Sequence, residues 1–247
     1  MRTQSISFGD QETLCVFPEE RSSLEQSISI LKLKGNHPVI VFTGGAIDEH
    51  LAEVTGRAIQ TISKIAEDLH AVVICGATDM GVMAAIGKTR SRNQYKFPLI
   101  GIAPEELVTW KDGPDSTNFL WWGTSRQQLE PHCSHFLLVP GTQFGDESEW
   151  IADTTVLVSK GHRSVTILIN GDEVSRKNIE LSLEQGRPVI ALSRTGRLAD
   201  DYSSQPERNK LISVAPANSE SRIIELMHAA LSVPEKSVAS ASLASTV

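Results

Sequence analysis

The stretch PVIVFTGG at residues 38–45 places a short apolar run directly before a threonine and two glycines. Such a run is typical of a strand buried on both faces, and the glycines predict a tight turn where the strand ends. Similar runs recur along the chain, at residues 71–75, 97–103, 134–139, 165–169 and 188–192, with a weaker one at 211–214. We expect these runs to form the strands of one sheet.

Helical patterns separate the apolar runs. Between residues 49 and 69 the apolar side chains recur at the spacing of one helix face. Further helices are predicted over residues 81–89, 147–159, 173–184 and 220–231. This alternation predicts an α/β, Rossmann-like, doubly wound fold with a mostly parallel sheet. Weak alternation over residues 4–8 and 12–17 predicts N-terminal edge strands or a hairpin.

The length of the chain sets its domain organisation. A chain of 247 residues can bury one core, and we expect residues 1–231 to form a single domain. Residues 232–247, rich in serine and alanine, are predicted to be disordered. Residues 104–133 join two strands and contain Trp110, Trp121 and Trp122. A connection of that length indicates a functional or mobile segment; the alternative is a surface flap that covers the core.

Composition narrows the classes of partner. The net charge of −7 arises from 30 acidic and 23 basic residues, and we find no basic stripe of the kind that duplex nucleic acid requires. Cys15, Cys75 and Cys133 are odd in number and widely spaced, which favours a reducing compartment over a disulfide framework. No apolar run approaches the roughly 20 residues that span a bilayer. We therefore expect a cytoplasmic protein without a membrane span.

Glycine-rich or polar turns follow the predicted strands, at residues 43–45, 76–81, 140–147, 170–171 and 193–197. The carboxyl ends of parallel strands share one edge of a sheet, where ligands bind at the point at which strand order reverses. In the usual order 3-2-1-4-5, the first and fourth of these strands would flank that point, and the turns at 43–45 and 141–145 would face each other. Glycine lets the backbone N–H groups approach phosphate oxygens. The predicted ligand contacts are Thr43, Gly44, Gly45, Gly76, Thr78, Asp79, Gly81, Gly141, Thr142, Gly145, Glu147, Asn170, Gly171, Ser193, Gly196, Arg197 and Asp200.

Several charged candidates have two interpretations. Glu147 and Glu149 begin a predicted helix, where a carboxylate either complements the helix dipole or bonds ribose hydroxyls. Asp79 either caps the following helix or approaches ribose. Arg197 either holds a diphosphate bidentately or is a solvated surface residue. Asp200 either orients Arg197 from three residues away or contacts ribose itself.

The sequence does not support a dinucleotide site, a P-loop or a metal site. The fingerprint Gly-x-Gly-x-x-Gly is absent after the first predicted strand, which disfavours a dinucleotide-dependent dehydrogenase. No Gly-Lys-Ser/Thr follows any glycine turn, which disfavours a P-loop NTPase. His132, Cys133 and His135 lack a second pair of ligands, so we predict no metal site.

The turns also carry a family resemblance. The segments VFTGG (41–45), ICGATDMGVM (74–83), IGIAP (100–104), LEPHCSHF (129–136) and SRTGRLAD (193–200) resemble the SLOG superfamily. The match is to its prokaryotic LSDAT branch, which is related to the N-terminal cytosolic domain of melastatin-type TRP channels. The resemblance implies a Rossmann-like domain that senses a nucleotide-derived ligand, with ADP-ribose and its cyclic relatives the leading candidates. It implies no required cofactor, and we expect a homo-oligomer because related domains often self-associate.

The same superfamily contains enzymes that cleave the base from nucleoside monophosphates. The resemblance implies their signature, Pro-Gly-Gly-x-Gly-Thr-x-x-Glu, at residues 140–148, but only Pro140 and Gly141 match. Thr142 and Phe144 replace glycines, and Ser148 stands where the glutamate belongs. A phosphoribohydrolase that uses Glu147 or Glu149 is therefore the alternative to a binding protein. A scaffold with a vestigial crevice is a third interpretation.

Overall fold

The computed structural model of the chain describes residues 1–9, 11–33, 35, 37–111, 113, 126–160, 163–205 and 209–231. The main sheet contains β1 (Arg2–Phe8), β2 (Gln11–Phe17), β3 (Val39–Gly44), β4 (Val72–Gly76), β5 (Leu99–Pro104), β8 (His135–Val139), β9 (Ser164–Ile169), β10 (Val189–Ser193) and β11 (Ile212–Pro216). A small parallel pair contains β6 (Val108–Thr109) and β7 (Gln127–Gln128). The helices are α1 (Leu24–Ile30), α2 (Ala52–Asp68), α3 (Gly81–Arg92), α4 (Ser148–Ser159), α5 (Glu173–Glu184), α6 (Arg197–Ser204) and α7 (Glu220–Leu231).

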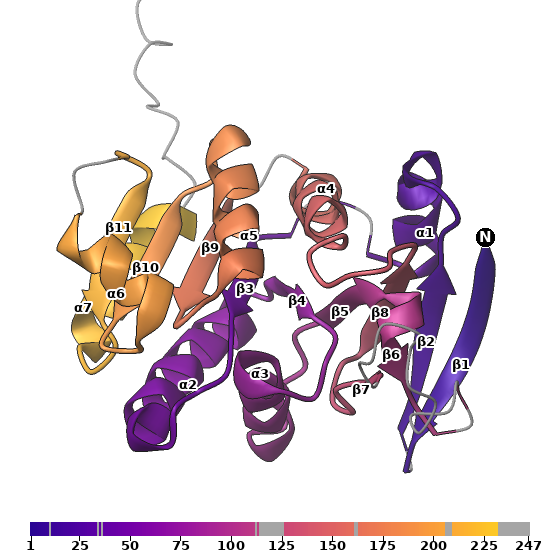
Figure 1. Cartoon of the computed structure of the whole chain (residues 1–247), viewed down its shortest axis with the longest axis horizontal. Helices are drawn as coiled ribbons and strands as arrows, with labels where there is room; N and C mark the ends of the chain where they lie inside the picture. The colour runs from indigo at the N-terminus through magenta and orange to yellow at the C-terminus, as the bar shows by residue number, and fades with distance from the viewer. Residues whose placement is uncertain are drawn as a thin grey trace, which may run out of the picture.

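The sheet confirms the predicted fold class. Its order is β1-β2-β8-β5-β4-β3-β9-β10-β11, and each neighbouring pair is parallel except β1 with β2. The antiparallel pair is the N-terminal hairpin, which forms one edge of the sheet (Figure 1). The molecule is a Rossmann-like, doubly wound α/β structure with a mostly parallel sheet.

The expected order of the buried strands is wrong in one respect. The fourth of the strands predicted from residue 38 onward, β8, lies beyond the third, β5, and the fifth, β9, lies beside the first, β3. Strand order therefore reverses between β3 and β9, so that the turns after β3 and β9 flank the switch point. The turn at 141–145 follows a strand three places away from β3.

Helices cover both faces of the sheet. Alternate residues of β3 illustrate the arrangement: Ile40 and Phe42 pack into the cluster that α2, α3 and α7 cover, whereas Val39 and Val41 pack into the cluster that α1 and α4 cover. A third cluster joins α5 and α6 to β9 and β10. Figure 1 shows α2 and α3 on one side of the sheet and α1, α4 and α5 on the other. Both faces of the central strands are buried, as the continuous apolar runs predict.

Details of the helices and of the long connection differ from expectation. The predicted helix at 49–69 begins with a 3-10 turn at Glu49–Leu51, and the helix predicted at 81–89 continues to Arg92. Helices α1 and α6 were not predicted. Trp110 is buried in the core, whereas Trp121, Trp122 and residues 232–247 lie outside the described residues. In the part of the chain that the structure describes, no helix has the length and apolarity needed to cross a bilayer.

Candidate functional site

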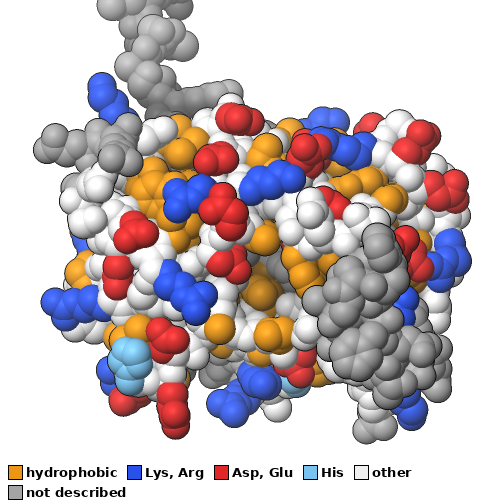
Figure 2. All heavy atoms as spheres, viewed as in Figure 1, with side chains coloured by type: hydrophobic (Ala, Val, Ile, Leu, Met, Phe, Trp, Pro, Cys, Tyr) orange, Lys and Arg blue, Asp and Glu red, His pale blue; other side chains and the backbone are white. Residues whose placement is uncertain are grey.

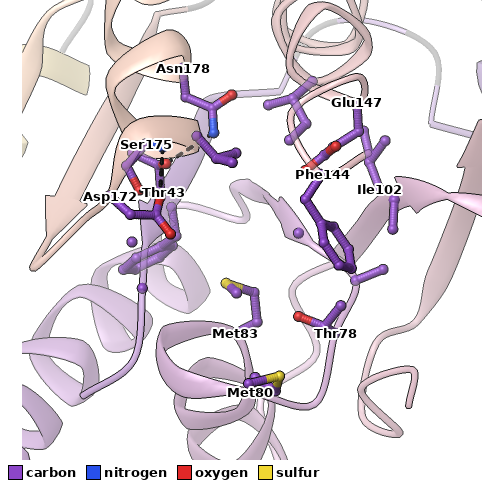
Figure 3. Close-up of a pocket in the computed structure, with 18 of the residues that line it drawn as sticks. Thr43, Thr78, Met80, Met83, Ile102, Phe144, Glu147, Asp172, Ser175 and Asn178 are labelled. Carbon is purple, nitrogen blue, oxygen red and sulfur yellow. Dashed lines mark hydrogen bonds between the residues drawn. The ribbon is translucent and has the colours of Figure 1, made fainter. Parts of the chain in front are cut away.

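A pocket of about 310 Å³ opens at the carboxyl edge of β3, β4 and β5. The first turns of α3, α4 and α5 surround it (Figure 3). Its lining residues are Phe42, Thr43, Gly44, Gly45, Ala46, Gly76, Ala77, Thr78, Met80, Met83, Ile102, Ala103, Gln127, Phe144, Glu147, Ile151, Asp172, Val174, Ser175 and Asn178. This volume lies within the range of small-molecule sites.

Two glycines allow the close packing that shapes the floor of the pocket. A Cβ atom on Gly44 would lie 2.2 Å from the carbonyl oxygen of Ile169, because β3 and β9 approach closely at the switch point. Gly81, the first residue of α3, has φ +50°, and a Cβ there would lie 2.2 Å from the carbonyl oxygen of Gly45. The same oxygen accepts the N–H of Val82 at 3.2 Å. The turn after β3 is thus joined directly to the start of α3.

The turn between β4 and α3 is held from its other side by residues 128–130. The N–H of Glu130 donates to the carbonyl of Ala77 at 2.8 Å, and the N–H of Asp79 donates to the carbonyl of Gln128 at 2.8 Å. Asp79 is exposed and lies 3.9 Å from Lys88. Among the described residues no side chain caps the first turn of α3, so the expectation that Asp79 caps this helix is wrong. The hydroxyl of Thr78 faces into the pocket (Figure 3).

One wall of the pocket comes from β3 and α5 and is polar. The Nδ2 group of Asn178 donates to Oγ1 of Thr43 at 3.0 Å, and Oδ1 of Asn178 is buried with no hydrogen-bond partner among the residues that the structure describes. Asp172 caps α5, since its Oδ1 accepts the N–H of Ser175 at 3.1 Å. In Figure 3 these four side chains stand together on the side of the pocket opposite Glu147.

Glu147 supplies a carboxyl group on the facing wall, at the start of α4. The residue is 5% exposed, and one of its oxygens accepts the N–H of Gly145 at 2.7 Å. Burial raises the pKa of Glu147 from 4.5 to about 6, although the Gly145 hydrogen bond and Lys177 oppose the rise. The rise occurs because burial disfavours the charged form of the carboxyl group. The oxygen that does not bond Gly145 can accept a hydrogen bond from a ligand hydroxyl. Glu149 lies on the outer side of α4 and pairs with Arg21.

Apolar side chains make up the rest of the pocket and its rim. Met80 is 50% exposed and Phe144 is 42% exposed, although both are large apolar residues that line the pocket. Met83 also lines the pocket (Figure 3). Figure 2 shows the surface hollowed near the middle of this face, with hydrophobic side chains in the hollow. An apolar rim of this kind suits a flat ring system.

In two of the turns predicted to bind phosphate, the backbone N–H groups already donate hydrogen bonds to carboxylates of the chain itself. Asp146 accepts the N–H groups of Thr142 at 2.9 Å and Gln143 at 3.2 Å. Asp200 accepts the N–H groups of Arg194 at 2.6 Å and Gly196 at 3.1 Å. These carboxylates stand where a phosphate would bind, and their charge repels an anion. The two turns therefore do not provide the open amide cradle that their glycines predict.

A second polar cluster adjoins the pocket at the β3/β9 switch point. Asn170 follows β9 and is 1% exposed, with φ +57°. Both polar atoms of its side chain are buried and find no partner within the described ranges of the chain. A Cβ on Gly45 would lie 3.8 Å from Oδ1 of Asn170 and 4.0 Å from a terminal nitrogen of Arg197. A Cβ on Gly196 would lie 3.2 Å from Nδ2 of Asn170. The structure thus brings Gly45, Asn170, Gly196 and Arg197 together.

The predicted contacts divide into two sets. Those that line the pocket are Thr43, Gly44, Gly45, Gly76, Thr78 and Glu147. Those outside its lining are Asp79, Gly81, Gly141, Thr142, Gly145, Asn170, Gly171, Ser193, Gly196, Arg197 and Asp200. Lining residues that the sequence reasoning missed include Met80, Met83, Asp172, Ser175 and Asn178. The signal for the last two was a helix, α5, whose buried face is polar at Ser175, Asn178 and Ser182.

Comparison with solved structures finds proteins of the same fold at low sequence identity. The structural-genomics target TM1055 aligns with a TM-score of 0.53 and 17% identity, over 78% of this chain and 99% of that one. The molybdenum cofactor carrier protein of Chlamydomonas reinhardtii gives 0.51 and 16%, over 78% and 99%. The molybdenum cofactor binding protein of the phototrophic bacterium Rippkaea orientalis gives 0.51 and 18%, over 78% and 97%. A comparison with the curated proteins found no match.

The family comparison covers most of the chain. The family described as "SLOG in TRPM, prokaryote" matches residues 37–233. This range begins just before β3 and extends through α7, and it leaves out the hairpin strands β1 and β2. It also contains every residue that lines the pocket, and it confirms the resemblance carried by the glycine turns. The chain belongs to the prokaryotic SLOG-in-TRPM family.

Proposed function

We propose that this protein binds a nucleotide-derived small molecule of the ADP-ribose type in the pocket at the carboxyl edge of β3, β4 and β5. The family and the fold support a ligand-binding Rossmann-like protein. The observation that carries the proposal is that the uncapped start of α3 meets, in one pocket, a wall of carboxyl and amide groups and an apolar rim. A ligand with an anionic group, hydroxyls and a flat ring fits these three surfaces.

The anionic group belongs at the turn between β4 and α3. Helix α3 runs from Gly81 to Arg92, and no side chain of the described part of the chain caps its first turn. A helix N-terminus carries about half a positive charge, and N–H groups that are not already bonded there point toward an anion. At the start of α3 the N–H of Val82 donates to the carbonyl of Gly45, which leaves the amides of Gly81 and Met83 for an anion. The start of α5 is capped by Asp172, and the turns after β8 and β10 hold Asp146 and Asp200. Among these turns, the start of α3 is therefore the most favourable for phosphate.

The hydroxyls and the ring occupy the remaining surfaces. Glu147 and Asp172 line opposite sides of the pocket, and each offers a carboxyl oxygen to a ribose hydroxyl. Asn178 adds a buried carbonyl oxygen with no partner. A purine ring placed between Met80 and Phe144 would cover apolar surface that is otherwise exposed. Binding and sensing require no more than these contacts.

A thermal-shift panel tests the proposal. ADP-ribose, cyclic ADP-ribose, NAD, AMP and a cyclic dinucleotide are each added to the full chain. A ligand at 100 times its dissociation constant stabilises the folded state by about 2.7 kcal/mol, which raises Tm by roughly 5–10 °C for a domain of this size. The Thr78→Val variant should bind about five- to tenfold more weakly, because it lacks the pocket hydroxyl. The control, Thr142→Val, changes an exposed residue of a carboxylate-filled turn and should bind normally. A panel without any shift contradicts the proposal.

One observation favours a phosphoribohydrolase as the second candidate. Glu147 is a buried carboxyl group whose pKa of about 6 suits a general acid or base near neutral pH. Nucleoside monophosphates incubated with concentrated protein would release free base, and the Glu147→Gln variant would stop the release while it still binds ligand. No free base from the wild-type protein leaves binding as the function.

A further inference from the structure

A second hollow, of about 490 Å³, lies at the opposite edge of the sheet from the pocket. It is formed where β9 and β10 begin and where α4 and α5 end. Its lining residues are Val156, Ser159, Lys160, Arg163, Ser164, Gln185, Gly186, Arg187, Pro188 and Ala230. Three of these side chains are cationic, and none of the described lining residues carries a carboxylate.

Arg187 is the buried cation of this hollow. The residue is 4% exposed, and its guanidinium group donates to Oγ of Ser164 at 3.3 Å, to Oγ of Ser182 at 3.2 Å, to the carbonyl of Ala152 at 3.3 Å and to the side-chain oxygen of Gln185. All four acceptors are neutral. Burial lowers the pKa of Arg187 to about 10, so the group is still charged at neutral pH. No carboxylate of the described chain pairs with it.

The two exposed cations of the hollow also lack acidic partners. Neither Lys160 nor Arg163 forms an ion pair with any described residue. Other basic residues of this acidic chain do pair: Lys64, for example, bonds Asp68, and Arg57 bonds Glu53. The hollow is therefore a local concentration of positive charge in a protein whose net charge is −7.

Helix ends account for only part of this charge. The carboxyl ends of α4 and α5 lie at the hollow, and each end of a helix carries about half a negative charge. Ala230, in the last described turn of α7, also lines the hollow, so three such ends offset about one and a half of the three positive charges and leave about one and a half. The Ser164 hydroxyl accepts from Arg187, and its own hydrogen can be donated to an incoming oxyanion.

We propose that this hollow binds a dianionic oxyanion, the phosphate group of inorganic phosphate or of a phosphate monoester, between Arg187, Arg163 and Lys160. The site is independent of the nucleotide pocket, because it lies at the other ends of α4 and α5. Arg187 and Ser164 form its base, and the two exposed cations close over the anion. Arg187 already donates four of its five N–H groups to neutral acceptors, so it contributes its charge and one remaining N–H. The planar guanidinium of Arg163 can bind two phosphate oxygens, and the lysine adds a point charge.

Isothermal titration calorimetry of the full chain at low ionic strength tests the site, with inorganic phosphate and glycerol phosphate as probes. The wild-type protein should bind at least one of them with a dissociation constant below about 1 mM. The double variant Lys160→Gln/Arg163→Gln should bind about tenfold more weakly or not at all. Both changes are at exposed positions, so folding is expected to be normal. Tighter binding of glycerol phosphate assigns the site to a phosphorylated metabolite, and equal binding assigns it to free phosphate; both results support it.

The controls separate this site from general charge effects and from the pocket. The variant Arg57→Gln/Lys64→Gln removes the same charge from the exposed face of α2 and should bind phosphate within twofold of wild type. The Thr78→Val variant should bind it equally well. Absence of binding by the wild-type protein, equal loss in the α2 variant, or unchanged binding in the Lys160/Arg163 variant overturns the proposal.

Discussion

Replacing Glu147 by glutamine tests the electrostatics of the pocket. Burial raises the pKa of this carboxyl group from 4.5 to about 6, a change of about 1.5 pH units. At about 1.4 kcal/mol per pH unit, protonation of Glu147 is more favourable in the folded protein than in the unfolded chain by about 2 kcal/mol. Since the folded pKa is raised, this contribution to stability is complete below pH 4.5 and is lost as the pH rises through about 6.

Glutamine removes the titration and keeps the hydrogen bond. Its side-chain oxygen can still accept the N–H of Gly145, which Glu147 accepts at 2.7 Å. Urea unfolding of wild type and variant between pH 4.5 and 7.5 measures the effect. The stability of Glu147→Gln relative to wild type should rise by about 2 kcal/mol over this range, most steeply between pH 5 and 6.5.

Glu149→Gln is the matched control for this experiment. Glu149 begins the same helix, but its side chain is largely exposed and pairs with Arg21 at the surface. Its removal should produce no comparable rise with pH, because exposed pairs contribute little. If the stability of wild type and of Glu147→Gln changed with pH in parallel, the claim that burial raises the pKa of Glu147 would be refuted. The assignment of an acid or base role to this residue would fail with it.

Four further substitutions test packing and the rim of the pocket. Gly81→Ala should destabilise the protein by roughly 2–4 kcal/mol in urea unfolding, since φ is positive and the new Cβ meets the Gly45 carbonyl at 2.2 Å. Gly186→Ala shares a positive φ but has open space, so it should cost only about 1 kcal/mol, and equal losses would contradict the contact argument. Phe144→Ser should weaken nucleotide binding about three- to tenfold in calorimetry and leave Tm of the free protein unchanged; normal affinity would exclude ring stacking at the rim. Gly56→Ala, in the middle of α2 with no atom near the new Cβ, should raise stability by about 0.5–1 kcal/mol, and a loss would show hidden crowding there.

The sequence predicted the strands well because each one is a local pattern. The run 38–42 is buried on both faces in β3, and the weak alternation of the first seventeen residues forms the hairpin. Helices α1 and α6 were missed because seven or eight residues are too few for a periodic signal. Strand order was mispredicted because the side of the sheet on which β8 and β9 pair depends on packing between distant segments, which no local pattern encodes.

The sequence predicted the parts of the candidate site that a single turn after a strand provides. It did not predict the parts that form only where a distant helix packs against that turn. Thr43, Gly45 and Thr78 lie at or just after the carboxyl ends of buried strands, where the rule for parallel sheets expects ligands, and all three line the pocket. Asn178 reaches the pocket from the second turn of α5, which the chain brings next to β3 only when the sheet is assembled. Its buried, unpaired oxygen has no sequence signature beyond a polar residue on an otherwise buried helix face.

The carboxylates that fill two of the turns show why glycine alone is a weak indicator of a phosphate site. Asp146 lies four residues after Thr142, and Asp200 lies four residues after Gly196, so each acid folds back onto amides of its own turn. Such an acid satisfies the same N–H groups that a phosphate would use and adds a negative charge beside them. The first turn of α3, which begins at Gly81, contains no acidic residue, and its Val82 amide donates to the neutral carbonyl of Gly45. A glycine turn without an acid in the following helical turn is therefore the stronger prediction of an anion site, and in this chain it selects the start of α3.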